Sequence, residues 1–98
     1  MIRVSCRRGD RWELTLSGHA GAAPYGRDLV CAAATALVCA LAGYVSEQPL
    51  EEPPTIRLQP GDAKIIAKGK DLAPAFETVL CGLKLLAEAY PESVRCEI

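Results

Sequence analysis

The chain contains a single histidine, His19, which precedes Cys31 by twelve residues. These two residue types can act together in nucleophilic catalysis, because an imidazole can take the proton of a thiol and the thiolate can then attack a carbonyl carbon. The stretch from Gly18 to Gly26 is rich in glycine and alanine and offers few side chains for burial. We therefore expect a loop that is poorly ordered without substrate and closes when substrate is bound.

A long uncharged segment, Leu29 to Ser46, follows this loop and is predicted to be a helix with Asp28 as its N-cap. The Asp28 carboxylate would accept a hydrogen bond from the N–H of Val30 or Cys31, which puts Cys31 at the third helical position. The positive end of the helix dipole favours an anion there, and hence a thiolate. Backbone N–H groups from Leu29 to Ala32 are candidates to stabilise the oxyanion of an acyl-transfer reaction.

The residue types alone leave a simpler interpretation open for this pair. A cysteine on an alanine-rich helix is more often a small buried hydrophobic residue than a nucleophile, and a lone loop histidine is more often merely solvated. Many chains of 98 residues contain both residue types, so their presence carries little specificity. The wider pattern around His19 and Cys31 has to decide between the two interpretations.

Two motifs of this chain resemble the signature of the ribosomal-processing cysteine protease family Prp: Gly18-His19-Ala20 and Tyr25-Gly26-x-Asp28-Leu29-Val30-Cys31-Ala32-x-Ala34-Thr35-Ala36. Members of this family are small bacterial enzymes that remove an N-terminal extension from a protein of the large ribosomal subunit. The resemblance extends to Ser46-Glu47-x-Pro49 after the helix and to the order of elements over the whole chain.

The resemblance implies roles for several residues. His19 and Cys31 match the catalytic pair, and Asp28 belongs to the same motif. Thr35 stands where the family usually has serine; it keeps the hydroxyl group but adds a methyl group. We therefore expect His19 and Cys31 to be catalytic and Asp28 and Thr35 to support them. No third residue that orients His19 can be identified from the sequence.

The resemblance also implies the surroundings of the site. Gly18, Gly21 and Gly26 would belong to the loop beside the catalytic pair. The substrate would be a peptide with hydrophobic residues before the scissile bond, taken from the N-terminal segment of a ribosomal protein. The family further suggests a homodimer, and its cysteine chemistry requires no cofactor.

The composition of the chain argues against several classes of function and site. A chain of 98 residues makes a single domain, 1–98, and its net charge of −1 leaves no basic footprint, so direct binding of nucleic acid is disfavoured. Five cysteines without a C-x-x-C pair, together with one histidine, make a zinc site unexpected. The N-terminus is interrupted by charged residues and has no apolar signal region. We expect a cytoplasmic protein with reduced thiols.

Alternating apolar residues predict strands at Ile2–Cys6, Trp12–Leu16, Thr55–Leu58, Ala63–Lys68 and Val94–Ile98. Gly9-Asp10 suggests a two-residue hairpin loop, and Pro60-Gly61-Asp62 a second turn. A second helix is predicted from Ala73 to Tyr90. Its apolar stripe predicts core positions at Phe76, Val79, Leu80, Leu83, Leu86, Ala87 and Tyr90. The order ββαββαβ predicts a two-layer α+β sandwich, with a largely antiparallel sheet and both helices on one face.

The uncharged helix from Leu29 to Ser46 is just long enough for a membrane span. We reject a span because the helix is alanine-rich and neither end carries a cluster of lysines or arginines. A helix that is apolar on every face must be buried on more than one side. We expect one side to pack on the sheet and another to face the second helix or a second subunit, and the remaining apolar surface leads us to expect a homodimer.

These observations favour a cysteine endopeptidase that removes the N-terminal extension of a large-subunit ribosomal protein through a Cys31/His19 dyad. One alternative is a non-catalytic, ribosome-associated interaction module in which Cys31 is structural. Another is a small thiol redox protein, which is disfavoured because no resolving cysteine lies near Cys31 in the sequence.

Overall fold

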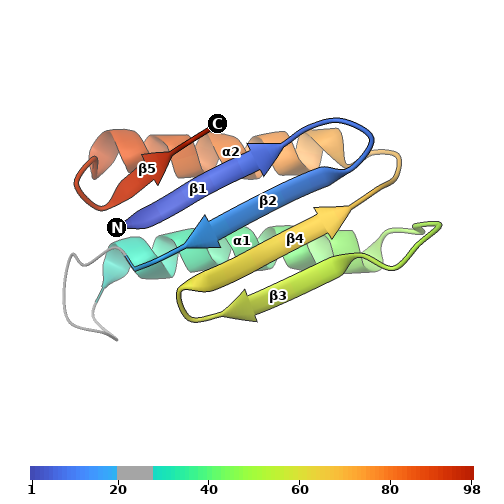
Figure 1. Cartoon of the computed structure of the whole chain (residues 1–98), viewed down its shortest axis with the longest axis horizontal. Helices are drawn as coiled ribbons and strands as arrows, with labels where there is room; N and C mark the ends of the chain where they lie inside the picture. Colours follow the sequence, from blue (N-terminus) through green and yellow to red (C-terminus); the bar gives the residue numbers. More distant parts are fainter. Residues whose placement is uncertain (20–27) are drawn as a thin grey trace.

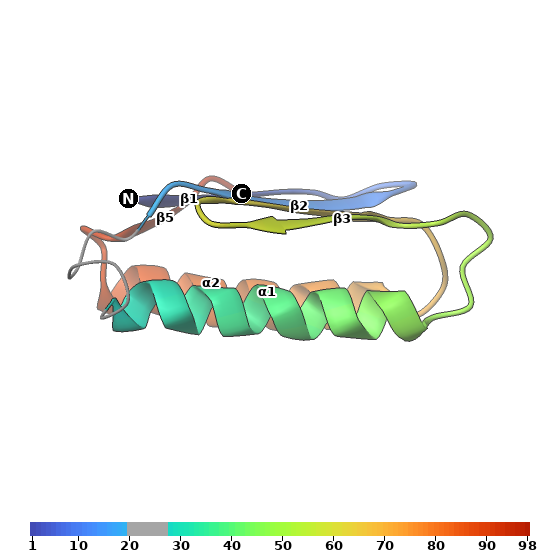
Figure 2. The ribbon, with the colours of Figure 1, turned by 90° about the horizontal axis from the view of Figure 1, so that it is seen from below.

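Five strands form one sheet, and two helices cover a single face of it, as the edge-on view in Figure 2 shows. This computed structural model describes residues 1–19 and 28–98. Gly21 and Gly26 lie outside the described residues, and so does most of the loop that we expect to be poorly ordered without substrate. The predicted two-layer α+β sandwich with both helices on one face is confirmed.

The elements follow one another as β1 (Ile2–Arg7), β2 (Trp12–Ser17), α1 (Leu29–Glu47), β3 (Thr55–Gln59), β4 (Asp62–Ala67), α2 (Ala73–Ala89) and β5 (Val94–Cys96). In space the strands have the order β3-β4-β2-β1-β5, with β3 and β5 at the two edges (Figure 1). All neighbouring strands are antiparallel except β1 and β5, which are parallel. The predicted order of elements and the largely antiparallel sheet are both confirmed.

The connection between β1 and β2 is longer than predicted. It runs over residues 8–11, and the register pairs Val4 with Leu16. A two-residue loop at Gly9-Asp10 would instead pair Val4 with Thr15 and turn β2 over relative to β1. The observed register puts the apolar side chains of Val4 and Leu16 on the same face, where both are buried. The hydrophobic core, rather than the local turn signal, therefore sets the length of this loop.

The hairpin of β3 and β4 turns through Pro60 and Gly61, because Gln59 pairs with Asp62. Gly61 has a φ of 71°, in the left-handed region that glycine adopts without strain. By register Leu58 shares a face with Ala63 and, through β4, with the buried Leu16. Leu58 is nevertheless 45% exposed, since β3 is an edge strand.

The core lies between the sheet and the helices. Helix α1 contributes Val30, Ala34, Val38, Leu41, Ala42 and Val45. Helix α2 contributes Phe76, Val79, Leu80 and Leu83, as the sequence predicts, whereas Tyr90 is 49% exposed after the end of the helix. Gly82 lets the helices approach closely, because a Cβ atom there would lie 2.9 Å from Cδ1 of Leu37 on α1.

Helix α1 is long and apolar enough to cross a membrane, with a mean hydropathy of 2.0 over its most apolar window, but only 33% of that window is buried. Its buried side chains join those of the sheet and of α2 in one core. Insertion into a membrane would have to withdraw these side chains from that core. Other faces of α1 are apolar and exposed, with Ala32, Ala36 and Ala40 among their residues.

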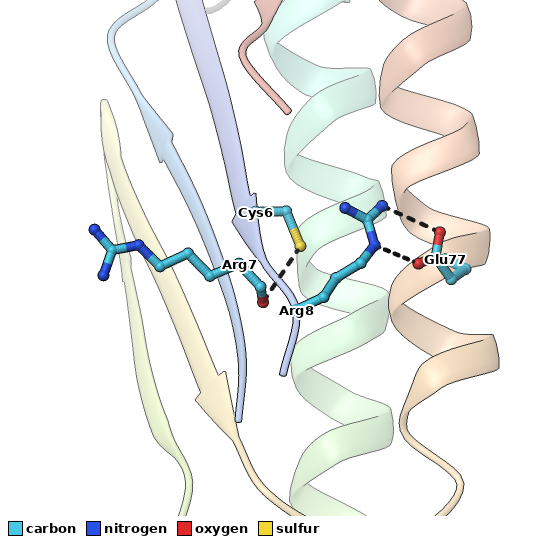
Figure 3. A network of polar contacts seen from close by, with 4 residues as sticks. All are labelled: Cys6, Arg7, Arg8 and Glu77. Atoms are coloured by element: carbon cyan, nitrogen blue, oxygen red, sulfur yellow. Dashed lines mark hydrogen bonds and ion pairs between the residues drawn. The ribbon is translucent and has the colours of Figure 1, made fainter. Parts of the chain in front are cut away.

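An ion pair between Arg8 and Glu77 connects the sheet to the helical layer (Figure 3). It lies at the end of the molecule away from the β3–β4 turn (Figure 1). Nε of Arg8 lies 2.6 Å from Oε1 of Glu77, and Nη2 donates to Oε2 at 3.3 Å. The Arg8 guanidinium also lies 5.8 Å from the centroid of the Trp12 ring, which stacks on Phe76. Arg8 therefore links the β1–β2 connection to the beginning of α2.

Candidate active site

His19 and Cys31 line the same open cleft, which has a volume of about 770 Å³. The cleft lies where β2 ends and α1 begins, and the β3–β4 hairpin forms another of its walls. The predicted site residues in the described part of the chain all line it: Gly18, His19, Asp28, Cys31 and Thr35. The fold thus brings together residues from two elements that the sequence separates by a loop.

Cys31 lies at the third position of α1, as predicted, and Asp28 is the N-cap. The Cys31 N–H donates to Oδ1 of Asp28 at 3.0 Å, and the Ala32 N–H donates to the carbonyl oxygen of Asp28 at 3.0 Å. These two N–H groups are therefore occupied, which corrects our expectation that all four from Leu29 to Ala32 could bind an oxyanion. Leu29 and Val30 remain the candidates, because they precede the first intrahelical hydrogen bond.

Thr35 lies one helical turn after Cys31 and also lines the cleft. Its Oγ1 donates to the carbonyl oxygen of Cys31 at 2.8 Å, so the hydroxyl group that threonine shares with serine bonds to the backbone of the nucleophile candidate. This bond needs no small side chain, and the added methyl group is accommodated on the exposed surface of α1. Thr35 thus supports the first turn of the helix.

Gly18 and His19 directly follow the end of β2. Gly18 has a φ of 91°, which favours glycine, and a Cβ atom at this position would lie 2.2 Å from the carbonyl oxygen of Met1. The Met1 amino group in turn donates to the carbonyl oxygen of His19. The backbone around His19 is therefore held against the start of β1, which explains why the residue before the histidine has to be glycine.

Apolar side chains make up much of the cleft: Ile2, Leu16, Val38, Leu58 and Ala63. Leu58 ends the strand predicted at Thr55–Leu58, and its exposed side chain adds apolar surface to the cleft that holds the candidate pair. Asp62 also lines the cleft, and its carboxylate is engaged by Arg57 at 2.9 and 3.0 Å. No sequence signal marks the hairpin as part of the site, because an apolar residue before a Pro-Gly turn is ordinary in any hairpin.

The other cysteines have different surroundings. Burial raises the pKa of the Cys6 thiol and that of the Cys96 thiol, which disfavours their thiolates. Cys6 also contacts the carbonyl oxygen of Arg7 at 3.9 Å (Figure 3). Cys81 is exposed on α2. Cys39 is exposed too and lines the cleft.

Cys39 and Cys31 are too far apart to form a disulfide bond. They lie eight residues apart on one helix, which separates them by ~12 Å along its axis at ~1.5 Å per residue. Cα atoms more than ~7 Å apart cannot be bridged without movement of the backbone. Among residues 1–19 and 28–98 there is also no cluster of three potential metal ligands.

Comparisons with known proteins identify the family of the chain. A family model described as cysteine protease Prp matches residues 1–95. The chain is similar to the essential ribosomal processing protease Prp from S. aureus in complex with a covalently linked product peptide, with a TM-score of 0.84, 28% identity and coverage of 98% of this chain and 97% of that one.

Two further solved structures are similar. The same S. aureus protease in complex with a substrate peptide matches with a TM-score of 0.74 and 25% identity, over 99% of this chain and 98% of that one. The protein SMU.848 from Streptococcus mutans matches with a TM-score of 0.73 and 28% identity, over 100% of this chain and 93% of that one. No curated protein matches the chain. With a family model covering nearly its whole length, the chain belongs to the cysteine protease Prp family and is a cysteine protease.

Proposed function

We propose that this protease removes the N-terminal extension of a large-subunit ribosomal protein, with Cys31 as the nucleophile and His19 as the general acid and base. One observation carries the proposal: in a chain of this family, the single histidine and the capped cysteine line one cleft with apolar walls. The similarity to a ribosomal processing protease crystallised with substrate and product peptides supports the choice of substrate.

The mechanism follows from these parts. His19 takes the thiol proton of Cys31, and the thiolate attacks the scissile carbonyl carbon to form a tetrahedral oxyanion. N–H groups in the first turn of α1 stabilise this oxyanion, with those of Leu29 and Val30 as the candidates. The imidazolium then protonates the leaving amine. Water, deprotonated by His19, hydrolyses the thioester and releases the cleaved N-terminal extension with a new carboxyl end.

The walls of the cleft indicate which peptides would bind. Leu58 and Val38 present apolar surface within the same cleft as Cys31, which suits hydrophobic residues before the scissile bond. Asp62 already pairs with Arg57, so its charge is partly satisfied within the hairpin. We therefore infer that recognition depends mainly on apolar side chains of the substrate.

Incubation with the host's own large-subunit ribosomal proteins, followed by intact-mass analysis, tests the proposal. One protein should lose an N-terminal segment with the wild-type enzyme and remain whole with Cys31→Ala or His19→Ala. Cys81→Ala is the matched control, because Cys81 is exposed on α2 and does not line the cleft. Cleavage by His19→Ala at the wild-type rate would refute the dyad, and an unchanged set of proteins would refute the substrate.

We also propose that the protein is a homodimer built on the outer face of the helices. A shallow apolar groove of about 450 Å³ lies there between α1 and α2, lined by Ala33, Ala36, Leu37, Ala40, Gly82, Leu85 and Leu86. Leu85 is 63% exposed. A second copy related by a two-fold axis would cover the same groove on both chains.

The cytoplasm is the proposed location. All five cysteines of the chain are free, which suits a reducing compartment. In the cytoplasm the protease would also encounter its proposed substrate, a large-subunit ribosomal protein. Fractionation of host cells, with detection of the protein in the soluble cytoplasmic fraction, tests this assignment; recovery from an extracellular fraction would contradict it.

A further inference from the structure

We propose that Gly61, in the β3–β4 turn, is a positioning residue that seats the imidazole of His19. The inference rests on the proposed catalytic role of His19 and adds to it a residue from a different element. Gly61 is forty-two residues away in the sequence but lines the same cleft as His19. The hairpin of β3 and β4 would thus take part in catalysis without touching the reacting atoms.

The imidazole occupies the space that a side chain at Gly61 would need. A Cβ atom built on Gly61 would lie 2.7 Å from Nε2 of His19, 3.2 Å from Cε1 and 3.3 Å from Cδ2. All three are ring atoms, so the ring as a whole lies over this part of the turn. Only glycine at position 61 leaves room for the imidazole where it is.

The backbone of the turn is tied directly to the residue before His19. The Gly18 N–H donates to the carbonyl oxygen of Gly61 at 2.9 Å, which extends the pairing of β2 with β4 beyond the ends of both strands. The Met1 amino group holds the His19 carbonyl oxygen from the other side. The backbone of His19 and the turn under its ring are therefore fixed relative to each other.

Packing on this turn is the restraint that the structure supplies for the ring. Within the described ranges, no hydrogen bond joins the imidazole to another side chain, and the carboxylate nearest in sequence to the turn, Asp62, is held by Arg57. A side chain at position 61 would push the ring away more readily than it would disrupt the backbone, because the clashing atoms are the end of a side chain. A substitution should therefore harm catalysis more than folding.

Two substitutions separate the contact from backbone strain. Gly61→Ala introduces a Cβ atom and also strains the backbone at a φ of 71°. Gly61→Asn introduces the same Cβ atom, but asparagine tolerates the left-handed region better than other residues. Gly9→Ala is the control for backbone strain, because Gly9 also lies in a connection between two strands and has a positive φ, of 157°, but a Cβ atom there would have nothing within 4 Å.

Proton NMR tests the contact without any variant, since His19 is the only histidine of the chain and its ring resonances need no assignment. The wild-type protein should show nuclear Overhauser effects between the ring protons of His19 and the Hα protons of Gly61. Gly61→Asn should shift the Cε1–H resonance of His19, whereas Gly9→Ala should not. Absence of the wild-type effects would overturn the proposal, whatever the activity.

Activity measurements on the processed ribosomal protein complete the test. Gly61→Asn should lower kcat by about one hundredfold, as expected for a catalytic group misplaced by ~1 Å, with little change in KM. Trp12 fluorescence should report a urea midpoint close to that of the wild type. A kcat within twofold of wild type in Gly61→Asn would overturn the positioning role. Full activity of His19→Ala would instead refute the proposed function and leave the contact between Gly61 and His19 standing.

Discussion

Cys31 lies in the first turn of α1, where Asp28 caps its N–H and its side chain lines the cleft. We expect Cys31→Ala and Cys31→Ser to fold normally and to lose cleavage, because alanine has no nucleophile and a serine hydroxyl is far less acidic than a thiol. Cleavage assays and Trp12 fluorescence measure the two properties separately. Retained processing by Cys31→Ala would show that the nucleophile is elsewhere.

The choice of control for this experiment depends on where the other thiols lie. Cys39 lies two helical turns after Cys31 on α1, where it is exposed and lines the cleft. Its replacement by alanine should therefore raise KM through lost contact with the peptide and leave stability almost unchanged. Cys81 on α2 is the better neutral control, because it lies outside the cleft.

Asp28 allows a second prediction at the scale of single residues. Asp28→Ala should lower the free energy of unfolding by about 1 kcal/mol, the usual effect of losing an N-cap side chain, whereas Asp28→Asn should retain most of the stability since asparagine also caps. Urea denaturation followed by Trp12 fluorescence compares the two. Equal destabilisation by both variants would mean that the charge of Asp28, rather than its hydrogen bond to Cys31, is what α1 requires.

The ion pair between Arg8 and Glu77 connects two elements, the β1–β2 connection and α2 (Figure 3). The hydrogen bond from Arg8 lowers the pKa of the Glu77 carboxyl. The pair therefore stabilises the fold above the ordinary pKa of glutamate, and this contribution disappears as the pH falls through the lowered value.

Glu77→Gln should accordingly lower the urea midpoint at pH 7, while the difference from the wild type should vanish in acid. Both partners are well exposed, so the effect should be small. Glu88→Gln, exposed on the same helix, is the control and should leave the midpoint unchanged at both pH values. A difference between Glu77→Gln and the wild type that persists unchanged in acid would contradict the ion pair as its source.

Elements defined by local signals could be predicted from the sequence. The start of α1 follows from the Asp28 cap and the uncharged run after it, and the structure places both as expected. The length of the β1–β2 connection could not be predicted, because it is decided by the burial of Val4 opposite Leu16, which are brought together only by the core. A turn signal such as Gly9-Asp10 carries no information about that distant pairing.

Some residues of the candidate site could likewise be predicted from the sequence, and others could not. The glycine-histidine motif and the capped cysteine lie close together in the sequence, and both line one cleft. The contact of His19 with Gly61 depends on the pairing of β2 with β4, whose residues lie far apart in the chain. Leu58 lines the cleft for the same reason, since only the edge position of β3 leaves it exposed.

At the scale of the whole molecule, an apolar surface on the two helices is left exposed to solvent in a single copy of the chain. Helix α1 buries one face in the core, and its alanines at positions 33, 36 and 40 line the outer groove with Leu85 and Leu86 of α2. Gly82 brings α1 and α2 close together beneath this groove. A continuous apolar groove across both helices, on the face turned away from the sheet, is typical of a surface that another chain covers.

Ala36→Glu should therefore split the proposed homodimer, because the two-fold axis would bury the new carboxylate without a partner. Ala36 is exposed within one chain, so the substitution should leave the fold of the monomer intact and lower thermal stability only by the contribution of the dimer.

Ala73→Glu is the matched control, since Ala73 is exposed at the start of α2 and does not line the groove. Sedimentation at micromolar concentration should show a dimer for the wild type and Ala73→Glu and a monomer for Ala36→Glu. A monomeric wild type would refute the dimer and leave the assignment of Cys31 and His19 unaffected, because both line a cleft formed within one chain.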